Sequence, residues 1–211
     1  EGAWLHSRYM VKNDVISHTE DPSNPWYTPE GAEAGDRGNI FVSTSANTTF
    51  ETAVNWWMRA PFHAVALLDP QLELTGFGVY TETAVSGNLP DWQMGATIDV
   101  ERGRIDQTAT GLTFPIFYPA NGGSTKLTRL SSGEFPDPLT SCAGYSSPAG
   151  APLIIQLGEG DAAIAVTDSS LQQDGVPIPH CTIDENSYSN DSSTAQQSGR
   201  IILGLRGAVI L

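Results

Sequence analysis

Residues 48–63 read TTFETAVNWWMRAPFH, and this stretch decides the fold class of the first half of the chain. Thr48 and Glu51 have the spacing of a capping box, in which each side chain accepts a hydrogen bond from the other residue's backbone amide. Apolar residues then recur at helical spacing, at Phe50, Val54, Trp57 and Met58. The stretch predicts a helix that begins at Thr48 and breaks at Pro61, followed by a short turn that carries His63.

The segments on either side of this helix complete a mixed pattern of helices and strands. Residues 3–13 place apolar side chains at helical spacing and predict an amphipathic helix. A loop rich in proline and glycine follows, and residues 74–80 then alternate in the manner of a half-buried strand whose expected partner is 96–100. Because no regular alternation of strand, helix and strand appears, we expect an α+β sandwich and not a doubly wound sheet.

After Gly103 the pattern changes to short runs separated by turn residues. The expected strands are 112–118, 152–157, 162–167, 176–183 and 201–211. Short strands at such spacing, without a helical stripe, predict a small all-β sandwich of immunoglobulin-like or fibronectin-like type. The sequence therefore predicts a first domain over residues 1–103, a linker over 104–113 and a β-sandwich over 114–211.

The composition is that of an acidic extracellular protein. Ten Lys and Arg residues against 24 Asp and Glu residues give a formal net charge of −14, which repels phosphate backbones and makes nucleic acid an unexpected partner. Cys142 and Cys181 form an even pair and are expected to make a disulfide. No apolar run approaches the ~20 residues that a transmembrane helix needs, and we expect the natural N-terminus, with any signal peptide, to lie outside this sequence.

The first 100 residues also contain a succession of short motifs that resembles the bacterial branch of the CAP superfamily (cysteine-rich secretory, antigen 5, pathogenesis-related). The motifs are His6-Ser7-x-Tyr9-Met10, Ile16-Ser17-His18-Thr19, Gly38-Asn39-Ile40, Trp57 to His63, and Leu68-Asp69-Pro70 followed by Gly76-x-Gly78. The resemblance implies a three-layer α-β-α sandwich with a cleft that two histidines and two glutamates line. Residues 118–122, 136–138 and 144–148 are similar to the β-domain that follows CAP domains in some exported bacterial proteins.

Carried over residue by residue, the two histidines of the family fall on His18 and His63. The two glutamates are absent, because Gly38 and Ala60 stand at their positions. Two histidines alone are a poor cage for zinc, which takes four ligands. Glu20 is the candidate replacement carboxylate for a divalent metal such as zinc. Asn39 and the aromatic pair Trp26 and Tyr27 are the other expected residues of the cleft.

The resemblance implies an extracellular or cell-surface binding module whose partner is a protein, a lipid or another surface ligand. Two alternatives are a metal-dependent hydrolase that uses the same cleft, and a lipid or sterol carrier that takes up a hydrophobic ligand in a groove on the helix side. No nucleophile motif frames any serine, so catalytic residues are not assigned and an enzyme is the less favoured interpretation. His6 is expected to be a surface or cap residue, outside the site.

Overall fold

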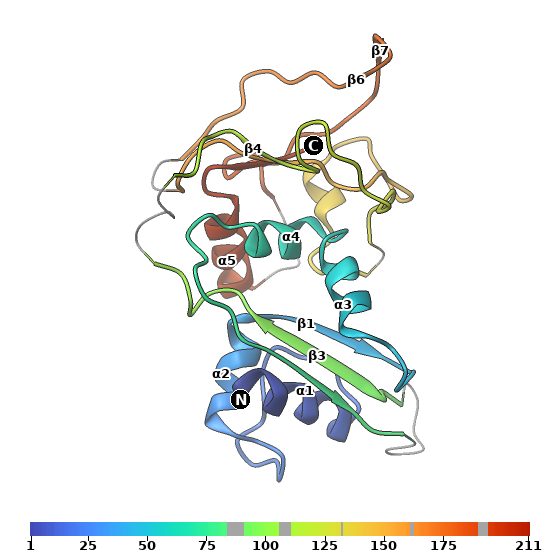
Figure 1. The fold of residues 1–211 in the computed structure, drawn as a ribbon, viewed down its shortest axis with the longest axis vertical. Coiled ribbons are helices and arrows are strands. Elements are labelled where there is room, and N and C mark those ends of the chain that lie inside the picture. Colours follow the sequence, from blue (N-terminus) through green and yellow to red (C-terminus); the bar gives the residue numbers. More distant parts are fainter. Residues whose placement is uncertain (84–90, 106–110, 132, 161–162, 190–193) are drawn as a thin grey trace. The chain divides into compact units, whose positions relative to one another are not determined.

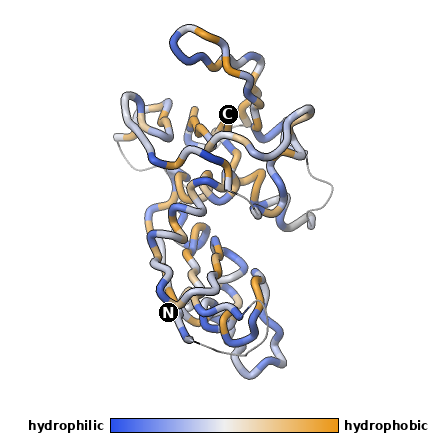
Figure 2. Tube along the Cα trace, turned by 90° about the vertical axis from the view of Figure 1, so that its right-hand side faces the viewer, coloured by the Kyte–Doolittle hydropathy of each residue, from blue (hydrophilic) through white to orange (hydrophobic). Residues whose placement is uncertain are grey.

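The computed structural model describes residues 1–83, 91–105, 111–131, 133–160, 163–189 and 194–211. The chain divides into two compact units (Figure 1). Unit 1 contains Glu1–Trp56 and Leu72–Ile105, and unit 2 contains Trp57–Gln71 and Asp106–Leu211. In both units the hydrophobic residues concentrate toward the inside and hydrophilic residues occupy many of the loops (Figure 2).

Unit 1 is built on an antiparallel three-stranded sheet in the order β1-β3-β2. Its elements are α1 (Gly2–Asn13), α2 (Pro29–Asp36), β1 (Gly38–Ser43), the first turns of α3 (Phe50–Trp57), β2 (Phe77–Thr81) and β3 (Met94–Asp99). The helix expected at 3–13 and the pairing of a strand near 74–80 with one near 96–100 are confirmed.

Helices α1 and α2 lie against one face of this sheet (Figure 1). α1 approaches the backbone so closely that a Cβ on Gly78 would lie 2.2 Å from the Trp4 nitrogen. Side chains of neighbouring strand residues point to opposite faces, so Phe77 faces away from α1. There its ring stacks on Phe50 of α3, with 4.5 Å between the centroids, yet Phe77 stays 61% exposed. α3 therefore contacts this second face without covering it.

The helix of residues 48–63 is confirmed, but its first residue is not. α3 begins at Phe50, and the hydroxyl of Thr49 accepts a hydrogen bond from the Thr52 amide at 3.3 Å. The cap is therefore Thr49 instead of the predicted Thr48. The expected break holds, since a second helix, α4, starts at Pro61 and runs to Leu67.

Unit 2 differs from the all-β sandwich that the sequence predicted. Its elements are α4 (Pro61–Leu67), β4 (Ile116–Tyr118), the 3-10 helix η1 (Pro138–Ser141), β5 (Ile154–Gln156), β6 (Gln172–Gln173), β7 (Val176–Pro177), α5 (Ala195–Leu205) and β8 (Ala208–Ile210). Strands β4, β5 and β8 form one small antiparallel sheet, and β6 and β7 form a hairpin. No immunoglobulin-like or fibronectin-like sandwich appears among the described residues.

The prediction of a strand over 201–211 is wrong for its first part, because residues 195–205 form α5. The hydrophobic core of unit 2 is made where α4 and α5 pack together with β5 and β8. Of the other expected strands, residues 163–167 and 178–183 contain no named strand, while 161–162 lie outside the described residues. Residues 106–110 of the predicted linker lie outside them as well.

The disulfide between Cys142 and Cys181 is present, as predicted. Cys142 directly follows η1, and Cys181 lies two residues before Ile183, which belongs to the core of unit 2. The disulfide therefore links the end of η1 to this core segment. Among the described residues, no helix is long and apolar enough to cross a membrane.

Candidate functional site

The histidines of unit 1 have different environments. His18 is half-buried in the loop after α1, and its Nδ1 lies 2.9 Å from the carbonyl oxygen of Gly35 in α2. A carbonyl only accepts, so Nδ1 carries the proton and Nε2 carries the lone pair in the neutral ring. This hydrogen bond fixes the tautomer and the orientation of the imidazole.

Glu20, the expected partner of the His18 site, is instead bonded to His6. Its Oε1 lies 2.9 Å from His6 Nδ1, and its Oε2 accepts from the Thr28 amide at 3.1 Å. Both side chains of the pair are fully buried. His6 Nε2 is 2.8 Å from the Ser17 carbonyl, so both ring nitrogens are hydrogen-bonded. The prediction that His6 is a surface residue is therefore wrong.

A signal for the burial of His6 was present in the sequence. Ala3, His6 and Met10 follow one another at spacings of three and four, and all three are buried on one face of α1. Trp4, one residue after Ala3, is 41% exposed.

His63 belongs to unit 2 and is paired with a carboxylate that the sequence analysis missed. Glu134 Oε1 lies 3.1 Å from His63 Nδ1 and accepts from the backbone amides of Phe62 at 2.8 Å and His63 at 3.3 Å. The first residues of α4 have no cap of their own, because Ala60 stands at the N-cap. Glu134 therefore caps the helix from another segment and orients His63 at the same time.

The Glu134 carboxyl is buried, with 1% of its side chain exposed, and its Oε2 has no hydrogen-bond partner among the residues that the structure describes. Burial raises the pKa of Glu134, and the hydrogen bonds from His63 and from the Phe62 and His63 amides only partly oppose this effect. A carboxyl whose pKa is raised in the folded state binds its proton more tightly there than in the unfolded chain. Its contribution to stability is therefore present at low pH and falls as pH rises through the folded pKa.

We expect Glu134→Gln to become more stable relative to the unchanged protein as pH rises. Between the ordinary pKa of 4.5 and the raised one, the unchanged protein loses about 1.4 kcal/mol per pH unit through this group, and glutamine does not titrate. Urea unfolding of both proteins at several pH values from 5 to 8 measures the difference between their unfolding free energies. A difference that does not change with pH would show that the pKa of Glu134 is not raised by folding.

The two positions at which the resemblance implies glutamates are closely packed or buried. A Cβ on Gly38 would lie 2.6 Å from the Ala34 carbonyl oxygen and 2.8 Å from that of Ile98. Ala60 is fully buried. Asn39, the next expected residue of the cleft, is also buried, on β1 where it pairs with Ile98.

The described residues do not fit a zinc cage. No group of three or more histidine, cysteine, aspartate or glutamate side chains in the described part of the chain is placed to hold a metal ion. Glu20 and Glu134 are the two carboxylates that contact a histidine of the described residues. Each is held by that histidine and by backbone amides. Structural zinc sites take four protein ligands and catalytic sites three, so these residues supply no complete site.

Unit 1 carries a cluster of aromatic and basic side chains around one side of α1, which we call the Arg8 cluster. Its members are Trp4, Arg8, Lys12, Trp26 and Tyr80. Residues 4, 8 and 12 fall on one face of α1 because they are four apart. The Arg8 guanidinium lies 5.1 Å from the ring centroid of Trp4 and 5.3 Å from that of Trp26, within the range of cation–π attraction.

The two cations of the Arg8 cluster differ in how their charge is compensated. Lys12 forms an ion pair with Glu82, to which the Tyr80 hydroxyl also donates. The hydrogen bonds from Lys12 and Tyr80 lower the pKa of Glu82. Arg8 pairs with no carboxylate among the described residues, and its Nε is buried without a hydrogen-bond partner. Within the described part of the chain, the guanidinium is therefore held by two indole rings without a counter-ion.

The aromatic residues of the cluster include Trp26, which the sequence placed in the cleft. Trp26 is 36% exposed and Trp4 is 41% exposed, so part of each ring faces solvent. Tyr27 is half-buried, and its backbone amide donates to the Asn24 carbonyl. Sequence reasoning missed Arg8, although its position four residues after Trp4 on a helix was the available signal.

Comparison with known proteins gives one family. The model of the CAP family, described as the cysteine-rich secretory protein family, matches residues 2–89. The match supports placing this part of the chain in the CAP superfamily, and together with the disulfide it is consistent with an extracellular protein. Searches of curated proteins and of solved structures gave no match.

Proposed function

We propose that this chain is an extracellular CAP-domain binding protein and that the Arg8 cluster is its binding surface for an acidic saccharide. The observation that carries the proposal is the uncompensated Arg8 guanidinium between two partly exposed indole rings. A guanidinium binds a carboxylate through two parallel hydrogen bonds. Flat indole faces supply apolar contact area beside that charge.

The charge of the chain supports a carboxylate ligand at this place. The protein has 24 acidic residues, yet no described carboxylate pairs with Arg8. The general acidity of the chain acts at long range and is screened beyond about 8 Å at physiological salt. Arg8 acts at contact distance. For a ligand that carries few charges, its attraction therefore outweighs the long-range repulsion from the acidic residues of the chain.

The size of the cluster favours a saccharide unit over a protein partner. A stable protein interface uses about 20–30 residues on each side, whereas the Arg8 cluster has five side chains. Its exposed apolar area consists of parts of ring faces, which match a ligand of one or two sugar rings. The extracellular setting that the CAP match supports is one in which acidic saccharides are accessible ligands.

Calorimetric titration with a trimer of galacturonate, against a neutral galactose trimer, tests the proposal. We expect binding of the acidic trimer only, and a loss of affinity of about ten- to a hundredfold in Arg8→Gln, because a charge-assisted hydrogen bond contributes about 1.5–3 kcal/mol. Arg37→Gln is the matched control, since Arg37 is also an arginine of unit 1 but lies near Glu33 and Glu101. Equal affinities in Arg8→Gln and in the unchanged protein would refute the proposal.

The divalent-metal binding that the sequence predicts at His18 and His63 stays a prediction. The two histidines belong to different units, so each is tested by itself. The test is zinc titration of the chelator-treated protein at about pH 7.5, where an ordinary imidazole is neutral, with His18→Ala and His63→Ala beside the unchanged protein. Binding that one substitution removes would identify that histidine as a ligand, and no binding by the unchanged protein would exclude both.

A further inference from the structure

A serine and a histidine of unit 2 lie in the relation that a nucleophile and its base require. Ser169 Oγ is 2.9 Å from His180 Nε2, and His180 Nδ1 is 3.1 Å from the Ile178 carbonyl oxygen. The carbonyl only accepts, so Nδ1 carries the proton and Nε2 accepts from the Ser169 hydroxyl. The arrangement has the order nucleophile, base and orienting acceptor that activated serines share.

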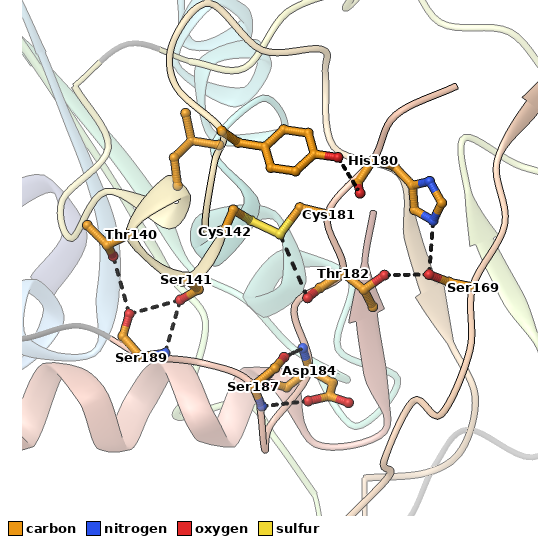
Figure 3. Close-up of a disulfide and its surroundings, with 12 residues drawn as sticks. Thr140, Ser141, Cys142, Ser169, His180, Cys181, Thr182, Asp184, Ser187 and Ser189 are labelled. Atoms are coloured by element: carbon orange, nitrogen blue, oxygen red, sulfur yellow. Dashed lines mark hydrogen bonds between the residues drawn. A yellow bond between two sulfur atoms is a disulfide. The ribbon is translucent and has the colours of Figure 1, made fainter. Parts of the chain in front are cut away.

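The surroundings of His180 hold it in place (Figure 3). Cys181, the next residue, is linked to Cys142. The Tyr145 hydroxyl donates to the backbone carbonyl of His180 at 2.7 Å. Ser169 lies between His180 and Thr182, whose Oγ1 is 2.8 Å from Ser169 Oγ. The disulfide and the Tyr145 hydrogen bond therefore hold the backbone at His180, and Thr182 holds the Ser169 hydroxyl.

Ser169 also lines a polar pocket of about 260 Å³. The other polar residues of its lining are Thr167, Asp168, Thr182, Asp184 and Ser187. Asp184 is part of the pocket wall. Its carboxylate is held in place because it accepts hydrogen bonds from the backbone amides of Val166, Asn186 and Ser187 at 2.7–2.9 Å. Burial alone would raise the pKa of Asp184, but these hydrogen bonds outweigh it and the pKa is lowered. The Asp184 carboxylate in the pocket wall therefore stays ionised at neutral pH and is held in a fixed position.

We propose that Ser169 and His180 form an acyl-transfer site for small esters of hydroxylated alcohols. The ester class follows from the nucleophile and base, and the alcohol class from the hydroxyl and carboxylate groups that line the pocket. Such groups hydrogen-bond a polyol better than an apolar chain, which would leave them unpaired. This function is independent of the Arg8 cluster, which belongs to unit 1.

The reaction proceeds in two balanced steps. Ser169 Oγ forms a bond to the acyl carbon while its proton passes to His180 Nε2, and the bond from the acyl carbon to the alcohol oxygen breaks as that oxygen takes the proton. Water then attacks the acyl carbon, gives its proton to Nε2, and the serine oxygen leaves and recovers that proton. The net change is hydrolysis of one ester to an acid and an alcohol.

Labelling with a fluorophosphonate at pH 8 tests the nucleophile, because its phosphorus forms a bond to an activated serine oxygen as fluoride leaves. We expect the unchanged protein to be labelled at Ser169, and Ser169→Ala to lose the label. His180→Gln should slow labelling by about 100-fold, since it removes the base. Ser141→Ala is the matched control, because Ser141 is also a serine of unit 2 but bonds to Ser189 and lies outside the pocket lining.

Hydrolysis of glycerol triacetate by the same four proteins tests the substrate class. The expected result is turnover by the unchanged protein and Ser141→Ala, and none above the buffer rate by Ser169→Ala. Urea unfolding of each variant, followed by circular dichroism, shows whether it folds as the unchanged protein does, so that a loss of activity is distinguished from a loss of folding. The proposal is wrong if the unchanged protein is neither labelled nor active, or if Ser169→Ala behaves in the same way as the unchanged protein.

Discussion

His6→Ala is expected to lower the unfolding free energy of unit 1 by about 3–5 kcal/mol, because it removes a packed ring and leaves a buried carboxyl without its hydrogen-bond partner. Glu20 would remain with a side chain that is fully buried and has lost its nearest partner. Two segments depend on the pair, because Glu20 also accepts from the Thr28 amide at the start of α2 and His6 reaches the Ser17 carbonyl. Urea unfolding followed by tryptophan fluorescence measures the change.

A double-mutant cycle separates the pair from the packing of the ring. Glu20→Gln is the milder variant, since an amide keeps one acceptor for the Thr28 amide without a buried charge. If His6 and Glu20 act as a unit, the loss in His6→Ala combined with Glu20→Gln is smaller than the sum of the single losses. A loss below about 1 kcal/mol in His6→Ala would show that the pair contributes little to stability.

Replacing Cys142 and Cys181 together with alanine is expected to lower the unfolding free energy of unit 2 by roughly 4 kcal/mol. The two residues are 39 apart in sequence, and in the chain-entropy model a loop of this length restricts the unfolded chain by about that amount. Unit 2 has short strands and a small core cluster, so this contribution is a large part of the stability of a typical domain.

Urea unfolding of the double variant, beside the unchanged protein with and without a thiol reductant, measures this effect. The reduced protein should unfold at the same urea concentration as the double variant, because both lack the cross-link. A reduced protein that is as stable as the oxidised one would show that contacts around η1 and Ile183 hold the segment without the disulfide.

The elements that the sequence predicted well are those with a local signal. Proline at 61 and the apolar spacing of 50–58 located α3 and α4 to within about two residues. α5 was predicted as a strand because residues 201–203 read Ile-Ile-Leu, a run that fits either element. Thr194 and Gln197 form a capping box at its start, and this signal would have corrected the prediction.

The partners of the histidines could not be predicted in the same way. His63 and Glu134 are 71 residues apart, and nothing local in either segment shows that they meet. His6 and Glu20 are closer in sequence, 14 residues apart, but Glu20 had two histidines within reach of its loop. Sequence spacing gives candidate pairs, and only the packing of the loop onto α1 and α2 selects one.

The most direct test of the Arg8 cluster is the NMR spectrum of the indole N–H groups during titration with the galacturonate trimer. The chain has five tryptophans and therefore five indole signals. Our account predicts that the signals of Trp4 and Trp26 shift as the ligand binds, while that of the buried Trp57 does not. Saturating ligand that leaves Trp4 and Trp26 unchanged would contradict it.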